Sequence, residues 1–304
     1  MNWKVLAPLN PAVPWLFGLM TFFTSLQCTY SDFPRFLKKP GPVLTALAVI
    51  HLVGPVFAWL VATLSIGLTG HLGHGMVLQN LVPMGVTAVV WAGIAKGDVP
   101  LALSTAAVDT VVTPVILPAT ALVVMGKSVS VDPWSLFTGL SQILLIPSLL
   151  AITANHFSRQ RIAARTVLAR SIITKFGLCL VVAISVAKAW PTLQATPANY
   201  PLLLALMALI SGAGYVFGYL AGRSGGWPPP IQRTLVFTGG MRNTVLGTVL
   251  ALNYFHPVAS VPIVLTMLFQ QPFAALSHRF LERAQKQKDR ELSRLAKRDK
   301  TRGL

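Results

Sequence analysis

The chain has 304 residues, of which 54% are hydrophobic and 11% are charged, and its mean hydropathy is +0.65. These values exclude an ordinary soluble domain and predict an all-α, polytopic helical membrane protein. The formal net charge of +17 is compatible with nucleic-acid binding, but the positions of the basic residues indicate membrane topology instead.

Nine apolar segments approach the roughly 20 residues that a helix needs to cross ~30 Å of hydrocarbon. The first segment is the shortest. We expect one transmembrane domain over residues 1–282 and a basic cytoplasmic tail over residues 283–304. The predicted spans are about 14–30, 41–66, 75–95, 98–126, 134–155, 167–190, 201–222, 231–254 and 259–281.

Lysine and arginine gather on one side of this arrangement. When the spans are numbered from an N-terminus outside the cell, one side receives nearly all loop cations and the ten in the tail after Leu276. The other side keeps only Lys4, Lys127 and Lys188. The positive-inside rule then places the C-terminus in the cytoplasm and the N-terminus outside, in the cell (inner) membrane. The tail mixes both signs at helical spacing, so we expect a solvated helix near anionic lipid and no nucleic-acid partner.

The sequence offers no residue pattern for catalysis. It contains no Gly-x-Ser-x-Gly, no His-Glu-x-x-His and no phosphate loop, so we do not expect an enzyme. Cys28 and Cys179 lie in separate apolar segments, and no Cys/His cluster has metal-ligand spacing. Only His51 among the six histidines lies within a span, where a lone histidine is more often packed than functional. We therefore expect no cofactor and no metal.

Two of the spans are interrupted by helix-breaking residues. Pro83 and Gly85 fall inside the third span, and Gly239 and Gly240 precede Arg242 inside the eighth. Because backbone groups in a bilayer must be satisfied by protein, such interruptions indicate broken helices that line an enclosed cavity. One interruption in each half of the chain is typical of inverted repeats whose broken helices cross near the midplane. The alternative is a proline kink in one span and close packing on glycine in the other.

Two charges lie deep in the predicted membrane. Asp109 shares a polar stripe with Thr105 and Thr113, which lie four residues to either side on one helix face. An unpaired carboxylate or guanidinium at that depth costs several kcal/mol. We therefore expect Asp109 and Arg242 to face the same cavity as an ion pair or coupling pair. The alternative is that hydroxyls, carbonyls or water satisfy each charge locally.

Several stretches resemble the bile acid:sodium symporter family, which belongs to the bile/arsenite/riboflavin transporter superfamily, and they occur in the family's order. They are Val13–Met20, Ser31–Phe33 and Lys39-Pro40, then Pro83–Val89 with Ala95–Val99, and finally Gly240–Asn243. The resemblance covers most of residues 11–280. It implies a secondary transporter of an organic anion that works by alternating access, with a panel domain, a core domain and two crossing discontinuous helices. The first span matches the family's second helix, which implies a nine-helix form.

The chain departs from the family where sodium-coupled members hold their ions. Oxygen-bearing side chains are replaced by apolar ones, and the glutamine of the second break is replaced by Arg242. The other replaced positions are Ile50, Ala88, Val89, Ala102, Ala106 and, for an acidic residue, Thr238. Because sodium requires several hard oxygen ligands, we expect sodium-independent transport, with Arg242 standing in for the cation and able to contact a carboxylate.

The expected substrate site surrounds the second break. Its predicted members are Arg242, Asn243, Thr87, Thr238, Gln270 and Gln271. The expected substrate is an organic anion, either bile-acid-like or a small carboxylate such as a pantoate-like acid or a keto acid. Asp109 is a candidate carrier of a coupled proton, because a partly dry cavity favours a protonated carboxylate whereas a nearby cation opposes protonation, and the sequence leaves open which effect prevails.

Other functions stay open at this point. A sodium-coupled symporter would use ion ligands that the resemblance does not identify. A non-transporting membrane sensor would also lack ion ligands, and fold alone does not decide between them. Arsenite efflux is disfavoured, because the reactive cysteine of arsenite transporters aligns with Met84. The sequence leaves substrate identity, transport direction and oligomeric state undetermined.

Overall fold

The computed structural model describes residues 7–30, 40–67, 70–126, 132–158, 161–195 and 199–302. Within these ranges the regular elements are all helices, and the only strand-like contact is one isolated β-bridge. The all-α prediction is therefore confirmed. The motif Ser31–Phe33, with Lys39 and the loop cations Lys4 and Lys127, lies outside the described residues.

The described helices occur in the following order along the chain. In the first half of the chain they are η1 (Ala7–Ala12), α2 (Val13–Ser25), α4 (Pro40–Ala48), η2 (Val49–Val53), α5 (Gly54–Ser65), α6 (His71–Leu81), α7 (Thr87–Ile94), α8 (Val99–Met125) and α9 (Pro133–Leu140). In the second half they are η4 (Ser141–Leu145), α10 (Ile146–Phe157), α11 (Arg161–Arg165), α12 (Val167–Ala195), α13 (Tyr200–Ser224), α14 (Pro229–Gly240), α15 (Thr244–Tyr254), η5 (Pro257–Ala259) and α16 (Ser260–Arg302).

Several of these helices have the length and apolar composition of membrane spans. Among the described residues five qualify, and they are Pro40–Ser65, Val99–Met125, Pro133–Phe157, Tyr200–Ser224 and Pro257–Gln287. Large apolar side chains on these and neighbouring helices face outward, as at Trp15, Val123 and Phe176, which are 81%, 82% and 70% exposed. Such exposure suits a lipid environment rather than water. The chain is a multi-pass membrane protein.

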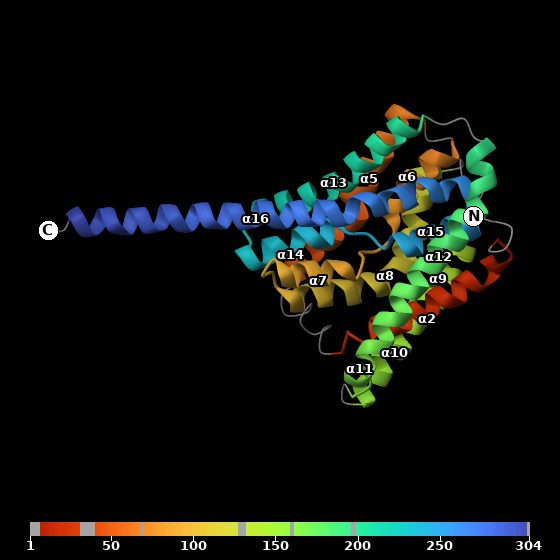
Figure 1. Cartoon of the computed structure of the whole chain (residues 1–304), viewed down its shortest axis with the longest axis horizontal. Coiled ribbons are helices and arrows are strands. Elements are labelled where there is room, and N and C mark those ends of the chain that lie inside the picture. The colour runs from red at the N-terminus through yellow and green to blue at the C-terminus, as the bar shows by residue number, and fades with distance from the viewer. Residues whose placement is uncertain are drawn as a thin grey trace.

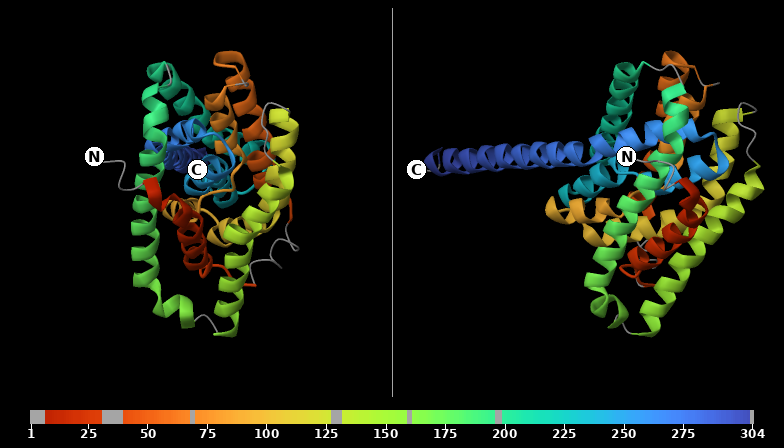
Figure 2. Two further views of the ribbon diagram at one scale, coloured as in Figure 1. Left: turned by 90° about the vertical axis from the view of Figure 1, so that its right-hand side faces the viewer. Right: turned by 45° about the vertical axis from the view of Figure 1, so that its right-hand side comes forward.

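Two groups of helices make up the molecule. In one group α2 packs against α10 and α12, and in the other α13 packs against α14 and α16 while α6 packs against α5 and α16. Figure 1 shows the first group at the lower right and the second toward the upper left. Figure 2 shows α16 projecting far beyond the remaining helices. Helix α8 contacts α6 and α14 of the second group and also η4, which packs against α2 and α10 of the first, so α8 connects the two groups.

Two spans are widened by single π-helical turns, which the sequence analysis did not anticipate. In η2 the amide of Gly54 donates to the carbonyl of Val49, and Pro55 follows directly. The turn η4 has the same form and is followed by Pro147. Proline has no amide to continue the ordinary ladder, and a π turn absorbs the irregularity.

Candidate functional site

The two broken helices cross each other through their interrupted backbones. Met84, between α6 and α7, forms an antiparallel bridge with Arg242, between α14 and α15. The amide of Gly85 donates to the carbonyl of Met241 at 3.0 Å, and the amide of Asn243 donates to that of Pro83 at 2.8 Å. Each break thus satisfies backbone groups of the other, as a membrane interior requires. The predicted crossing of discontinuous helices is confirmed, whereas the inverted repeat stays a prediction.

Local sequence explains where the second break begins and ends. Helix α14 stops at Gly240, and Met241 is extended. A Cβ atom on Gly240 would lie 2.4 Å from the ring of Tyr215, so only glycine fits against that ring. The side chain of Asn243 restarts the helix by accepting a hydrogen bond from the amide of Leu246 at 3.1 Å.

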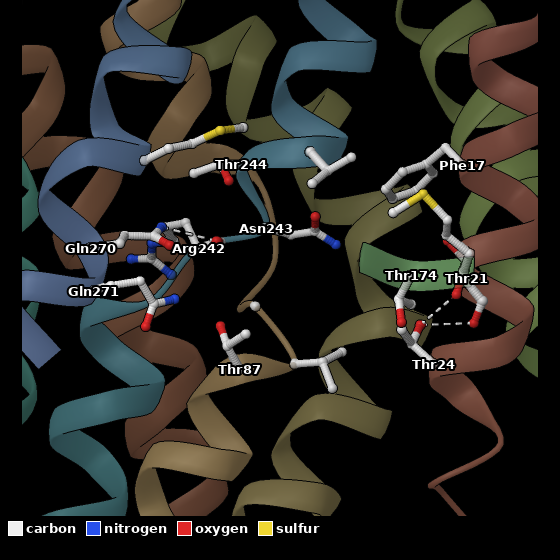
Figure 3. Close-up of a pocket in the computed structure, with 15 residues that line it drawn as sticks. Phe17, Thr21, Thr24, Thr87, Thr174, Arg242, Asn243, Thr244, Gln270 and Gln271 are labelled. Atoms are coloured by element: carbon white, nitrogen blue, oxygen red, sulfur yellow. Dashed lines mark hydrogen bonds between the residues drawn. The ribbon is translucent and has the colours of Figure 1, made fainter. Parts of the chain in front are cut away.

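A cavity of about 310 Å³ lies beside the crossing, between the two helix groups. In Figure 3 the amide of Asn243 points into this space, toward threonines on α2 and α12. Most of the remaining wall is apolar. The lining residues are Phe17, Met20, Thr21, Thr24, Gly85, Val86, Thr87, Thr174, Arg242, Asn243, Thr244, Val245, Met267, Gln270 and Gln271.

Most of the predicted substrate residues meet in this cavity. Its lining includes Arg242, Asn243, Thr87, Gln270 and Gln271. The exception is Thr238, which is fully buried in α14 and donates its hydroxyl to the carbonyl of Leu235 at 3.3 Å.

The opposite wall of the cavity supplies polar groups that the sequence analysis did not select. Thr21 and Thr24 lie on α2 and Thr174 lies on α12. The hydroxyl of Thr24 donates to backbone carbonyls of its own helix, including that of Met20 at 3.0 Å. Single threonines in apolar helices carry no signal that separates a cavity wall from self-satisfied helix packing.

Arg242 is buried behind the crossing. Its residue exposure is 5%, and its Nη2 donates to the carbonyl of Val49 at 3.5 Å. Its Nη1 has no hydrogen-bond partner among the described residues. A Cβ atom on Gly54 would lie 2.6 Å from Nη2, so this glycine makes room for the guanidinium. Figure 3 shows the guanidinium beside Gln270 and Gln271, on the side away from Asn243.

Hydrogen bonds from neighbouring helices hold the crossing in place. The side-chain amide of Gln270 donates to the carbonyl of Arg242 at 3.0 Å, and Tyr215 donates to the carbonyl of Gln270 at 2.7 Å. The indole of Trp91 donates to Gln271 at 2.8 Å. The two predicted glutamines therefore connect α16 to both broken helices.

Asp109 contacts the first break from helix α8. It is fully buried, and its Oδ2 accepts from the amide of Met84 at 2.7 Å. Its Oδ1 lies 2.6 Å from Nε2 of His51 and 3.2 Å from the hydroxyl of Thr113. The third stripe residue, Thr105, bonds to its own helix at Leu101.

The coupling role expected for Asp109 and Arg242 stays a prediction. Asp109 does not line the cavity, and the described residues contain no direct ion pair between the two. The close partner of Asp109 is His51, a residue that the sequence analysis set aside as packed. No periodicity links positions 58 residues apart, so the pairing is visible only in three dimensions.

The positions where the family resemblance places sodium ligands form an apolar cluster. Ile50, Ala88, Val89 and Ala102 are buried together with Met84. These side chains contain no oxygen atom with which to bind sodium. The described residues also hold no group of three or more His, Cys, Asp or Glu side chains that could bind a metal.

This fold and crossing define a multi-pass helical transporter, and comparisons with known proteins agree. The family model described as Sodium Bile acid symporter family matches residues 14–194. The chain belongs to this family of membrane transporters.

Individual relatives extend the match along the chain. It is 34% identical over 280 residues to an uncharacterized protein, YbaS, of Bacillus subtilis, covering 90% of this chain and 89% of that one. It is 25% identical to an uncharacterized sodium-dependent transporter, YocS, of the same organism, covering 81% and 75%. It is 23% identical to a probable chloroplastic sodium/metabolite cotransporter, BASS2, of rice, covering 83% of this chain and 59% of the relative.

Proposed function

We propose that this chain is a sodium-independent secondary transporter of an organic anion. The observation that carries the proposal is Arg242, a buried cation at the crossing with an unpartnered Nη1. The positions at which the family resemblance places sodium ligands form an apolar cluster with Met84. A fixed guanidinium supplies positive charge beside the cavity where sodium-coupled relatives would need a bound ion.

The cavity suits a carboxylate with a small apolar body. Asn243 and Thr87 offer polar groups next to the crossing, and Met267 and Val245 offer apolar contact. Its volume of about 310 Å³ lies at the lower end of ordinary ligand pockets, about 300–1,000 Å³. We therefore infer a small carboxylate in preference to a bile-acid-sized substrate.

Topology and coupling complete the proposal. We infer nine spans in one domain over residues 1–282, with the N-terminus outside, the C-terminus in the cytoplasm and the protein in the inner membrane. Alternating access would move the group containing α2 and α12 against the crossing. Asp109, which bonds to the crossing at Met84, takes part in proton coupling.

The test is uptake of labelled pyruvate, pantoate and taurocholate into proteoliposomes. Parallel reactions would carry an inward sodium gradient, an inward proton gradient, or neither. We expect flux that ignores sodium, responds to protons and favours the small carboxylates. Flux driven by sodium would contradict the proposal and favour a symporter, as the name of the relative YocS suggests. Binding without flux would favour a membrane sensor.

A further inference from the structure

The second span carries a buried histidine for which the proposed function has no role. His51 lies in the π turn η2, and its Nε2 is 2.6 Å from Oδ1 of Asp109. The side chain of His51 is 8% exposed, and that of Asp109 is 0% exposed. The imidazole is therefore the more accessible member of a histidine–carboxylate pair.

This pair is attached to the crossing itself. Oδ2 of Asp109 accepts from the amide of Met84 at 2.7 Å, and Met84 is bridged to Arg242. Nη2 of Arg242 donates to the carbonyl of Val49, which lies in the same π turn as His51. The carboxylate thus contacts the imidazole directly and is linked to Arg242 through the backbone of the crossing.

Charged side chains approach the π turn η2 from three places. Helix α8 supplies Asp109, and the break between α14 and α15 supplies Arg242. Helix α13 supplies Arg223, which shares a groove with Val49 and bonds to the hydroxyl of Tyr219 at 3.1 Å. The other titratable side chains on described elements packed against η2 are His71, His74, Tyr200, Tyr215 and Arg233.

The formal charges at the crossing decide what it can bind. With a neutral His51 that donates its Nε2 proton, the charges of Asp109 and Arg242 sum to zero. An added proton goes to Nδ1, because Nε2 is engaged with the carboxylate. The crossing then has one excess positive charge in a place where an unbalanced charge is costly. A monoanion in the adjacent cavity restores the balance.

We propose that His51 is the proton-binding site of this transporter, and that a proton on His51 and a monoanion in the cavity bind together. Asp109 is the shared counter-ion. When His51 is charged, the carboxylate is engaged by the imidazolium, and the charge of Arg242 is available to the substrate. The inference rests on the proposed function for the nature of the anion, and it assigns one proton to each monoanion.

The test is histidine-selective nitrogen NMR of the full-length protein in detergent micelles. Neutral imidazole and imidazolium have distinct nitrogen signals, and the signals of His51 are those lost in His51→Gln. Without any anion, we expect these signals to convert from neutral to protonated as the pH falls from about 8.5 to about 5. Signals that stay constant over this range would overturn the inference, whether or not an anion binds.

A second arm adds pyruvate or cholate at constant pH. We expect a saturating anion to raise the ratio of protonated to neutral His51 about fivefold or more, as coupled sites typically do. Anion binding that leaves the His51 signals unchanged would also overturn the inference. If His51 titrates but neither probe binds, the proton site is supported and the proposed anion transport fails.

Two variants separate coupling from simple proximity. Asp109→Asn keeps an acceptor for the amide of Met84 but removes the negative charge, so the crossing is already positive and anion binding no longer needs a proton. We expect this variant to bind the anion without converting His51. His156→Gln, at the far end of α10, is the matched histidine control and leaves both arms as in the parent. Coupling that persists in Asp109→Asn would contradict the shared counter-ion.

Discussion

The two broken helices share one backbone design and differ in how they obtain charge. Both interrupt a helix for a few extended residues, and each gives the other an amide and a carbonyl. The break after α6 has no charged residue and takes its carboxylate from Asp109 of α8. The break after α14 carries its own charge in Arg242, which bonds to the carbonyl of Val49.

This difference separates geometry from binding. Neutral backbone hydrogen bonds hold the crossing, and they would do so with any side chains that permit the breaks. The charges belong to side chains, that of Arg242 in the second break and that of Asp109 on α8, and they determine which ions the crossing accepts. Variants that affect charge should therefore change transport, whereas variants that affect the fit of the breaks should change stability.

The largest expected effect comes from removing the charge of the second break. Arg242→Gln keeps polarity and approximate size, and we expect it to lower carboxylate uptake about 100-fold or more, as loss of one partner of a buried charge pair does. Arg242→Lys keeps the charge but loses the planar fork, so we expect an intermediate rate. Initial uptake rates in proteoliposomes would measure both.

The matched control is Arg279→Gln, which removes an exposed charge on α16. It should transport at the parental rate. If Arg242→Gln and Arg279→Gln transport alike, the guanidinium at the crossing has no role in anion binding.

The second prediction compares the glycines of the two breaks. A Cβ at Gly240 would lie 2.4 Å from the ring of Tyr215, whereas a Cβ at Gly85 would lie 3.0 Å from the carbonyl oxygen of Arg242. We expect Gly240→Ala to destabilise the protein by about 1 to 3 kcal/mol, the usual range for overpacking, and Gly85→Ala to cost less. Thermal melting in detergent would rank them.

Gly70 provides the control for these variants, because a Cβ there meets nothing within 4 Å. Gly70→Ala should melt as the parent does. A larger loss for Gly85→Ala than for Gly240→Ala would mean that the first break is the tighter of the two.

The third prediction displaces the charge without removing it. A Cβ at Gly54 would lie 2.6 Å from Nη2 of Arg242, and the guanidinium, as the end of a flexible side chain, can move. We expect Gly54→Ala to fold and to lose about tenfold in uptake, equivalent to about 1.4 kcal/mol. Unchanged uptake in a folded Gly54→Ala protein would show that the contact with Val49 does not matter.

The smallest expected effect concerns the ends of α6 and α15 that lie away from the two breaks. Helix α6 begins at His71, whose ring stacks on that of His256, with ring centroids 3.9 Å apart. The pKa of His256 is lowered from 6.5, first by burial and then by the charge of His71, and the pKa of His74 is lowered by the same causes. The folded state therefore binds fewer protons than the unfolded state below pH 6.5, and stability falls as the pH drops through this value.

Melting temperatures measured on either side of that pH would test this dependence. In His256→Gln the melting temperature should decrease less on acidification than in the parent, since the variant removes one of the affected groups. A loss as steep in His256→Gln as in the parent would show that other groups control the acid response.

Much of the fold was predictable because a bilayer restricts what a chain can do. Apolar runs of span length indicate helices, and Pro83, Gly85 and Gly240 interrupt the two spans that the structure shows as broken. The crossing followed from the same rule, because two interrupted backbones in hydrocarbon must satisfy each other. The π turn at Val49–Val53 was not predictable, since proline after glycine also fits an ordinary kink.

The site was predictable where it depends on local sequence. Arg242 and Asn243 stand out because charge and amide are rare in these segments. His51 was missed because its significance depends on Asp109, on a helix that is distant in sequence and adjacent in space. Thr238 was selected from its place in a motif, but its hydroxyl turns back to Leu235 within its own helix.

Helix α16 links the cavity wall to the far end of the molecule without a break in its helical structure. It contributes Gln270 to the wall and runs on to Arg302, a distance of about 48 Å at the rise of an α-helix. A rod of this length magnifies motion, so a tilt of about 10° at the wall would move its tip by about 8 Å. A rearrangement at the crossing that is too small to resolve directly would therefore be measurable as a displacement of a label attached to this tail.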